Sequence, residues 1–272
     1  MKPKDFFNKH SVFRYDEFYQ FMKENGVRQN DAIHRSLSYY HKKGEIISIR
    51  RLLYAVNPES NFAKYEINPY LVAAKATNNS IIAYHSALEL HGLAYTTFEE
   101  IAYLTETNSR GFSFQNQNYR PICYPKSLAT KEDKLFAIDT VQKYEISIKV
   151  TSLERTLVDI LDRPSLAGGW EEIIRSIDHV ISIDMEKLVH YVKLLNKSSI
   201  ASKVGYFLEQ LPKYLNFEQK YFDQLLENIP KQPFYIDANT KGKGDGVYIK
   251  KWHLIVPRYI IDRQWEEPNV NV

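Results

Sequence analysis

The stretch "AIHRSLSYYHKKGEIISIRRLLYAV", residues 32–56, decides the expected fold of the N-terminal part of the chain. Its first half carries apolar residues at helical spacing, which share one buried face: Ile33, Leu37 and Tyr40. Gly44 then ends the helix, because glycine readily adopts the conformation of a helix C-terminus. The second half is typical of two short strands around a tight turn near Arg50 and Arg51. The stretch therefore predicts a long helix followed by a two-stranded hairpin.

Two shorter helices are expected before this stretch. Residues 3–9 predict a short helix that turns Phe6 and Phe7 inward. Residues 15–24 predict a second helix from apolar side chains at helical spacing: Phe18, Phe21 and Met22. The order of helix, helix, longer helix and hairpin is that of a winged helix-turn-helix. We therefore expect such a DNA-binding unit over residues 1–57.

The composition is that of a globular protein, and the length is sufficient for two domains. The chain has 272 residues, of which 44% are hydrophobic and 25% charged. A mean hydropathy of −0.43 and the lack of a long apolar run predict no transmembrane helix. The N-terminal residues lack the apolar segment of a secretory signal. The single cysteine, Cys123, excludes an internal disulfide and a cysteine-based zinc site, which fits a reducing cytoplasm.

Positive charge is concentrated at the N-terminus. Residues 1–57 hold 11 Lys and Arg against 6 Asp and Glu, a charge of 11 − 6 = +5. The remaining residues hold 25 against 27, a charge of 25 − 27 = −2. A basic N-terminal unit on a slightly acidic body is a modest indication of nucleic-acid contact.

The longer helix offers side chains suited to DNA. Arg, Asn and Gln read guanine or adenine edges in the major groove, and lysines at the helix end reach phosphates or complement the helix dipole. The hairpin tip is placed to contact a phosphate or the minor groove. The predicted DNA-binding residues are Arg28, Gln29, Asn30, His34, Arg35, Ser38, Lys42, Lys43, Arg50 and Arg51. An alternative stays open, because winged-helix units also serve as protein-interaction modules.

The rest of the chain predicts an α+β body over residues 58–272. Helices are expected in "NPYLVAAKATN" and "IAYHSALELHGL", and strands at 101–105, 111–115 and 120–124 and in "KLFAIDTV" and "YEISIKV". Five helical segments follow, and "WHLIVPRYI" predicts a closing strand in which Pro257 marks an edge or an end. The expected fold is therefore a winged helix-turn-helix followed by a larger α+β domain with a mixed sheet and a helical C-terminal section.

The segment "SLERTLVDIL" has two interpretations. Ser152 can cap a helix, and Arg155 can pair with Asp159 one turn further on. In the first interpretation this is a capped helix whose ion pair holds the domain together. In the second it is a functional surface or, through Arg155, a nucleotide contact, for which the candidates are Ser152, Glu154, Arg155 and Asp159.

Enzyme motifs are weak. Asp139, Glu145 and Lys149 lie on two adjacent strand-like runs, as in metal nucleases, but the pattern needs an acid at position 147, which is serine. The loop "TKGKGDGV", residues 240–247, lacks the spacing of a phosphate-binding loop. The histidines show no metal-ligand spacing, and His85 and Ser86 are adjacent and cannot face each other on a helix. We therefore expect no catalytic residue, no metal and no cofactor.

Four blocks resemble one family. They are "VFRYDEFYQFM…LSYYHKKGEIISIRRLLYAV", "IAYHSALELHGL", "VTSLERTLVDILDRPSLAGGWEEIIRSI" and "SKVGYFLEQL", which fall in family order between residues 12 and about 215. They resemble the AbiEi-type antitoxins of type IV toxin–antitoxin (abortive infection, phage defence) systems. The chain departs from the family pattern at Arg14, where a Ser or Thr would commonly cap the second helix. Nothing after residue 215 resembles the family.

The resemblance implies a transcriptional regulator with two partners. One is operator DNA, bound at inverted repeats upstream of its own operon. The other is a nucleotidyltransferase-like toxin encoded next to it, which the antitoxin counteracts with or without direct contact. The resemblance thus makes Ser152, Glu154, Arg155 and Asp159 candidates for an antitoxin surface. Inverted repeats imply a weak dimer or two monomers side by side on DNA. No membrane partner is expected.

Overall fold

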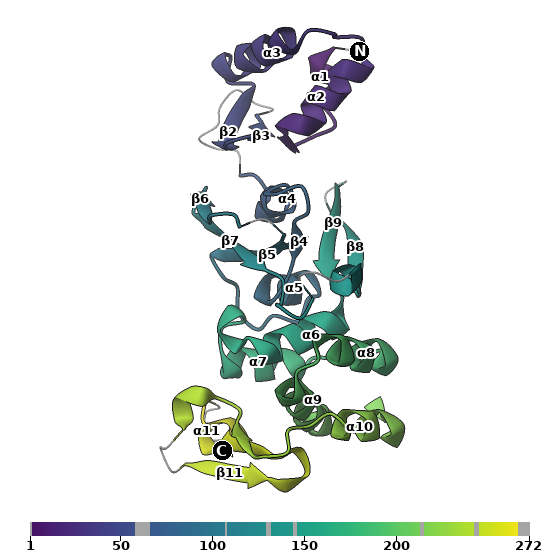
Figure 1. Ribbon diagram of the computed structural model, residues 1–272. Coiled ribbons are helices and arrows are strands. Elements are labelled where there is room, and N and C mark those ends of the chain that lie inside the picture. The colour runs from purple at the N-terminus through teal and green to yellow at the C-terminus, as the bar shows by residue number, and fades with distance from the viewer. Residues whose placement is uncertain are drawn as a thin grey trace. The chain divides into compact units, whose positions relative to one another are not determined.

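The computed structural model describes residues 2–57, 66–106, 108–128, 132–143, 146–212, 215–241 and 245–265. Its helices and strands form a mixed α+β structure, as the sequence predicts (Figure 1). The chain divides into two compact units. Unit 1 takes Met1–Ile82, Glu99–Cys123 and Thr140–Lys149, and unit 2 takes Ala83–Phe98, Tyr124–Asp139 and Val150–Val272. This division does not test the expected boundary at residue 57, which stays a prediction.

The first 57 residues contain the predicted helices and hairpin and one further strand. The elements are α1 (Pro3–Phe7), β1 (Val12–Arg14), α2 (Tyr15–Glu24), α3 (Asn30–Lys42), β2 (Ile46–Arg50) and β3 (Leu53–Val56). They include a three-stranded sheet in the order β1-β3-β2, in which both pairings are antiparallel. The strand β1 was not predicted, and it completes the sheet on the far side of β3.

An aromatic cluster forms the core of these residues. The rings of Phe6, Phe7, Phe13 and Phe18 contact one another, with centroids 5.2 to 6.0 Å apart. From α3, Ile33 and Leu37 complete the cluster, as their spacing predicts. Phe21 and Tyr40 are only partly buried and pack against its edge. The buried stripe of α3 therefore leaves the opposite face of this helix to solvent.

The first turn of α2 has no Ser or Thr cap, and a different hydrogen bond stabilises it. The backbone N–H of Arg14 donates to Oε2 of Glu17 at 2.8 Å, which is one half of a capping box. The Arg14 side chain has no acceptor to complete the box. Its guanidinium instead donates to the carbonyls of Lys75 and Ala76, each at 3.3 Å. The departure from the family pattern is thus compatible with a helix beginning at Tyr15.

A six-stranded mixed sheet follows in the order β6-β7-β5-β4-β9-β8. Its strands are β4 (Ile81–Ile82), β5 (Glu100–Thr105), β6 (Phe112–Phe114), β7 (Gln117–Cys123), β8 (Ile138–Lys143) and β9 (Ile146–Thr151), with α4 (Pro69–Ala74) before them. The pair β5–β7 is parallel, whereas β4–β5 and β6–β7 are antiparallel. The sheet is mixed as predicted, and each expected strand has a counterpart. Two expectations were wrong in part: the "KLFAIDTV" strand begins only at Ile138, after a 3-10 turn, and β4 was not predicted because Ile82 was expected in a helix.

Unit 2 is mainly helical. Its α-helices are α5 (His85–Leu90), α6 (Leu153–Asp162), α7 (Trp170–Ile177), α8 (Met185–Leu195), α9 (Ser198–Gln210), α10 (Gln219–Leu226) and α11 (Arg258–Ile261). Short 3-10 turns lie at Glu132–Leu135, Pro164–Leu166, Ala238–Thr240 and Lys250–Trp252. A small sheet in the order β10-β12-β11 joins β10 (Phe234–Tyr235), β11 (Gly246–Ile249) and β12 (Leu254–Pro257). Pro257 ends β12, as predicted, whereas β10 and β11 were not predicted.

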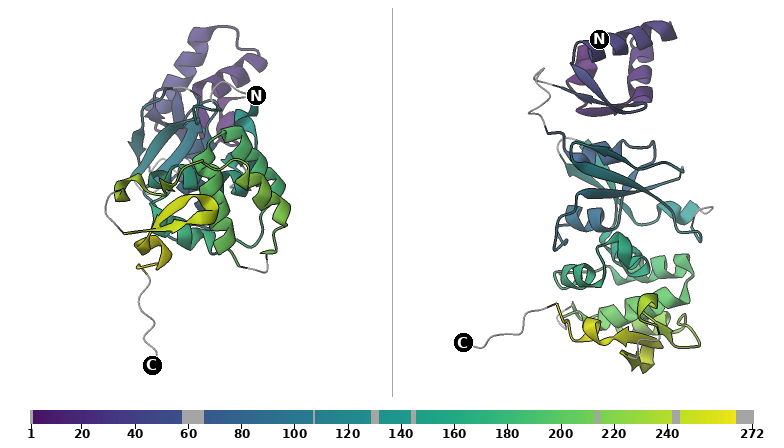
Figure 2. Two further views of the ribbon diagram at one scale, coloured as in Figure 1. Left: turned by 60° about the horizontal axis from the view of Figure 1, so that its bottom comes forward. Right: turned by 90° about the vertical axis from the view of Figure 1, so that its left-hand side faces the viewer.

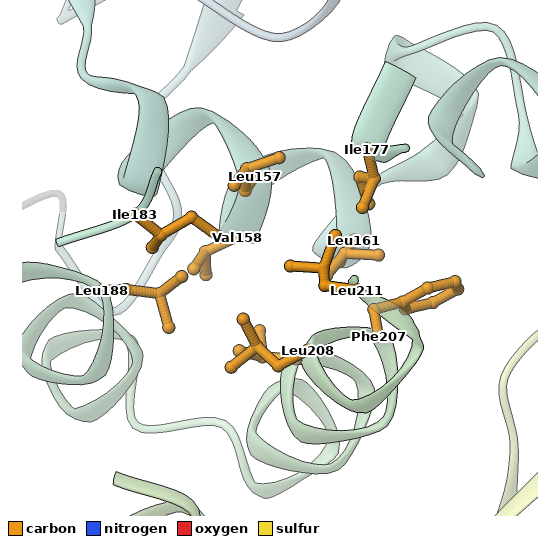
Figure 3. A pocket seen from close by; sticks show the side chains of 10 residues that line it. Leu157, Val158, Leu161, Ile177, Ile183, Leu188, Phe207, Leu208 and Leu211 are labelled. Carbon is orange, nitrogen blue, oxygen red and sulfur yellow. The ribbon is translucent and has the colours of Figure 1, made fainter. Parts of the chain in front are cut away.

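The core of unit 2 contains a small apolar void between α6, α8 and α9. Its volume is about 20 Å³, and its lining is entirely aliphatic and aromatic. Figure 3 shows the side chains of Leu157, Val158, Leu188 and Leu208 converging on it. A bound water needs two or more polar partners, and this lining offers none from its side chains. The lining therefore does not favour a bound water.

The C-terminal sheet is held to α9 by a close contact (Figure 2, yellow against green). Trp252 is fully buried, and its indole N–H donates to Oε2 of Glu209 at 2.7 Å. The ring lies on Gly205, where an added Cβ would approach it to 2.1 Å. Glycine is therefore required at position 205 by space and not by backbone conformation. Among the described helices, none is long and apolar enough to cross a membrane.

Candidate nucleic-acid interface

The outer face of α3 gathers most of the predicted DNA-binding residues. The helix spans 13 residues with Gln29 at its N-cap position, and Ile33 and Leu37 turn into the core. The residues that point to solvent are Arg28, Gln29, Asn30, His34, Arg35, Ser38, Lys42 and Lys43. The predicted amphipathic pattern thus places eight of the ten candidates on or beside one exposed helix.

The connection between α2 and α3 is held by one side-chain and one backbone hydrogen bond. Lys23 of α2 donates from Nζ to the carbonyl of Arg28 at 2.6 Å. The backbone N–H of Val27 donates to the carbonyl of Met22 at 3.0 Å. These bonds hold the chain just before α3, where Arg28 and Gln29 precede the first helical residue.

Two tyrosines of α2 contact two candidates on α3. The hydroxyl of Tyr15 lies 3.0 Å from Nε2 of His34, and the two rings stack with centroids 5.0 Å apart. The hydroxyl of Tyr19 donates to Oδ1 of Asn30 at 2.9 Å. The side chains of His34 and Asn30 are therefore oriented from the neighbouring helix.

Lys43, at the C-terminal end of α3, is a firmly charged group. Its Nζ lies 4.6 Å from the ring centroid of Tyr39. A hydrogen bond with the Tyr39 hydroxyl raises the pKa of the Lys43 ammonium above its ordinary value. Lys43 and the adjacent Lys42 are thus exposed cations at the negative end of the helix dipole.

The two hairpin arginines, Arg50 and Arg51, differ in exposure and in their contacts. Arg50 is half-buried, and its guanidinium donates to Oγ of Ser109 at 3.3 Å and to the carbonyl of Arg110 at 3.4 Å. The same group lies 4.9 Å from the ring centroid of Phe112. Arg51 is exposed in the turn between β2 and β3. The structure therefore places Arg51 at the hairpin tip and holds Arg50 against residues 109–112.

The predicted antitoxin candidates form a buried cluster on α6. Oγ of Ser152 accepts the N–H of Arg155 at 3.4 Å, and Nε of Arg155 lies 3.5 Å from Oδ2 of Asp159. Both the cap and the ion pair agree with the sequence prediction. Ser152 and Arg155 are 0% exposed, Asp159 is 2% and Glu154 is 7%.

Contacts from distant residues hold this cluster in place. Arg155 Nη1 donates to the carbonyls of Lys134 at 2.8 Å and Phe136 at 2.7 Å. The hydroxyl of Tyr191 donates to Oδ1 of Asp159 at 2.7 Å. Burial raises the pKa of Asp159 even though Arg155 and the Tyr191 hydrogen bond act to lower it. The geometry favours the first interpretation of this segment, a helix held inside the domain by its ion pair.

Two further polar sites in unit 2 were missed by sequence reasoning. His85 is buried, with Nδ1 3.1 Å from Oε1 of Glu89 and Nε2 3.2 Å from Oε1 of Glu172. Lys203 lines a groove of about 540 Å³ between α9 and residues 234–239, and burial lowers its pKa. Its Nζ donates to the carbonyl of Leu161 at 3.1 Å, at the end of α6. The available signals were the four-residue spacing of His85 and Glu89 and a lone lysine in an apolar helix.

The nuclease hypothesis gains little from the described residues. Asp139 lies in β8 and Lys149 in β9, while Glu145 lies outside the part of the chain that the structure describes. The loop at 240–247 is described only at 240–241 and 245–247. Across the described ranges, no group of three or more His, Cys, Asp or Glu is placed to hold a metal ion.

Comparison with known proteins gives a likeness of fold. No protein-family model matches the sequence, and no curated protein matches it either. A solved structure, described as "Crystal structure of RV2827C protein from Mycobacterium tuberculosis", is similar with a TM-score of 0.56. The alignment covers 94% of this chain and 90% of that chain at 16% sequence identity. The similarity extends over nearly all of both chains and concerns the fold alone.

Proposed function

We propose that the chain is a DNA-binding antitoxin that represses its own operon and neutralises a nucleotidyltransferase-like toxin. In this proposal residues 1–57 are a winged helix-turn-helix, in which α2 and α3 are the helix pair and the β2–β3 hairpin is the wing. The element order α1-β1-α2-α3-β2-β3 and the three-stranded sheet support this reading.

The observation that carries the DNA half is the exposed polar face of α3. The major groove admits one α-helix, and the N-terminal residues of a recognition helix face the base edges. Arg28, Gln29 and Asn30 occupy that end of α3, and Arg35 lies one turn further on. Lys42 and Lys43 are placed for phosphates, which position a protein on DNA without reading sequence.

The competing role, a protein-interaction module, predicts an apolar face. The large apolar side chains exposed among the described residues of this unit are Tyr39 at 52% and Leu52 at 40%. They lie apart, one on α3 and one in the hairpin turn. Isolated exposed apolar residues are ordinary on protein surfaces. The charged residues around α3 favour DNA as the partner.

The antitoxin half rests on the resemblance of the four sequence blocks, three of which lie beyond residue 57. We assign it to residues 58–272 and propose no catalytic residue there. The burial of Arg155 and Asp159 supports a structural role for the most family-like block. The surface that acts on the toxin is therefore to be sought on other residues of this domain.

Binding of the full chain to upstream DNA tests the repressor half. Fluorescence anisotropy with duplexes from upstream of its own gene, at two salt concentrations, should show affinity that falls as salt rises. Arg28→Ala and Arg35→Ala should each weaken binding by about 1–3 kcal/mol. Lys149→Ala removes an exposed cation outside residues 1–57 and should leave binding unchanged. Absence of binding by folded protein at low salt would refute the proposal.

Growth rescue tests the antitoxin half separately. The chain is co-expressed with the nucleotidyltransferase encoded beside it, from promoters that the repressor does not control. The Arg28→Ala/Arg35→Ala double variant should rescue growth as well as the unaltered chain does. A folded double variant that fails to rescue would show that the two activities are not divided between the two parts of the chain.

A further inference from the structure

We propose that Tyr15 and Tyr19 are positioning residues that turn His34 and Asn30 into hydrogen-bond donors, so that α3 selects guanine at the bases these side chains reach. The inference rests on the proposed DNA binding and names the base that this site prefers. Its physical basis is the pair of contacts between α2 and α3, here called the tyrosine pairs: Tyr15 with His34 and Tyr19 with Asn30.

The tyrosine pairs have a regular geometry. Tyr15 and Tyr19 are four residues apart on α2, and Asn30 and His34 are four residues apart on α3, so each couple lies along one helix face. Tyr15 contacts His34, and Tyr19 contacts Asn30, which lies one turn earlier on α3. Two successive turns of α3 are thereby oriented by two successive turns of α2.

Asn30 is deprived of the arrangement that reads adenine. An asparagine reads adenine through two bonds, in which its oxygen accepts from N6 and its nitrogen donates to N7. Oδ1 of Asn30 is turned toward Tyr19, whose hydroxyl donates to it at 2.9 Å. The other end of the same amide, Nδ2, is a donor only and makes no part of this contact.

Tyr15 acts on His34 as Tyr19 acts on Asn30. The hydroxyl of Tyr15 lies 3.0 Å from Nε2 of His34, and we take the phenol as the donor of this bond. In a neutral imidazole whose Nε2 accepts a hydrogen bond, Nδ1 carries the proton. The outward nitrogen of His34 is then also a donor.

Guanine is the base that matches a row of donors. In the major groove guanine offers two acceptors, N7 and O6, whereas adenine pairs one acceptor with a donor. Arg28 and Arg35 on the same surface are donors only. Asp31 is the acidic residue in the first turn of α3, where a carboxylate favours the helix dipole. The donors around α3 therefore outnumber the acceptors it offers to DNA.

The tyrosine pairs matter more for recognition than for folding. Both hydrogen bonds are exposed to water, which competes for the same groups. The core of this unit is made instead by the phenylalanine cluster with Ile33 and Leu37. Removing a tyrosine hydroxyl should therefore leave the fold intact and change the bases that the helix accepts.

The test compares duplexes that differ by single acceptor atoms. Each guanine of the bound upstream site is replaced in turn by 7-deazaguanine, which lacks the N7 acceptor, or by adenine paired with thymine. The full chain, Tyr15→Phe, Tyr19→Phe and the control Tyr248→Phe are titrated against each duplex. Tyr248 is exposed on β11, outside residues 1–57, so the control removes the same hydroxyl elsewhere.

For the unaltered chain and the control, at least one guanine-to-adenine exchange should weaken binding, and 7-deazaguanine at that position should do the same. Tyr19→Phe frees Oδ1 of Asn30 and should reduce the preference for guanine over adenine there by about tenfold. In an Asn30→Ala background, Tyr19→Phe should have no further effect, because the tyrosine acts through Asn30.

The outcomes separate the two proposals. If the unaltered chain binds no upstream duplex, DNA binding itself fails. If it binds but shows no dependence on guanine N7, or if Tyr15→Phe and Tyr19→Phe keep the preference of the control, the inference is wrong while DNA binding stands. Circular dichroism and thermal unfolding of each variant identify a loss of binding that comes from misfolding.

Discussion

Replacing Gly205 by alanine tests how the C-terminal sheet is attached to α9. The added Cβ would lie 2.1 Å from the ring of Trp252, far inside contact distance. The ring is fully buried, so it cannot swing into solvent without moving the residues around it. Either Trp252 leaves its place or the small sheet shifts away from the helix.

Opposing effects set the expected magnitude. Alanine in a helix interior is favoured over glycine by about 1 kcal/mol. Overpacking a well-filled core costs about 1–3 kcal/mol. Displacing Trp252 also removes its hydrogen bond to the carboxylate of Glu209, worth about 1.5–3 kcal/mol. We expect a net loss of about 1.5–5 kcal/mol in the free energy of unfolding of unit 2.

Tryptophan fluorescence is a selective assay for this loss. The three tryptophans of the chain, Trp170, Trp252 and Trp265, all belong to unit 2. Urea unfolding followed by their emission therefore reports on this unit and not on unit 1. A midpoint lower by about 1–2 M urea corresponds to the expected loss.

A double-mutant cycle decides whether the ring is the cause. In a Trp252→Leu background the clash is removed, so Gly205→Ala should be neutral or should stabilise the unit by about 1 kcal/mol. An equal loss in both backgrounds would refute the steric argument. Unchanged stability of Gly205→Ala alone would refute it as well.

Two further predictions concern charge. Arg51→Ala should reduce the slope of log affinity for DNA against log salt by about 1. Arg50→Ala should change this slope less, because Ser109 and Phe112 already hold the Arg50 guanidinium. DNA titrations across a series of salt concentrations measure both slopes. The second prediction concerns Lys203, whose pKa is lowered in the folded state, so the unfolded chain binds this proton more tightly. The stability of unit 2 should therefore rise with pH between the lowered pKa of Lys203 in the folded state and its pKa in the unfolded chain, about 10.5. Lys203→Met should abolish that part of the rise, as urea midpoints at several pH values would show.

Local patterns predicted the N-terminal elements because their signals lie within short windows. The helices at Pro3–Phe7, Tyr15–Glu24 and Asn30–Lys42 each carry apolar residues at helical spacing. The strand Val12–Arg14 was missed because three residues show no alternation, and its partner β3 lies some 40 residues later. The strands Phe234–Tyr235 and Gly246–Ile249 were missed for the same reason of length.

The candidate site was predictable only where exposure follows from helix periodicity. His34, Arg35 and Ser38 are exposed because the opposite face of α3 is buried. The position of Arg50 depends on Ser109 and on other residues about 60 positions away, which no local pattern contains. The burial of Arg155 likewise depends on carbonyl groups of residues 134 and 136.

The interleaving of the two units has a consequence for synthesis on the ribosome. The chain passes between the units at residues 82/83, 98/99, 123/124, 139/140 and 149/150. Unit 1 therefore lacks the strands β8 and β9 until residue 149 has left the exit tunnel. Unit 2 cannot complete its fold until the segment Val150–Val272 has been synthesised. The hydrophobic cluster around Phe6, Phe13 and Phe18 lies within residues 2–57, so its members are all synthesised before the first of these crossings. Once residue 82 has left the tunnel, the chain therefore exposes the strand β4 before its partner β5 has been released.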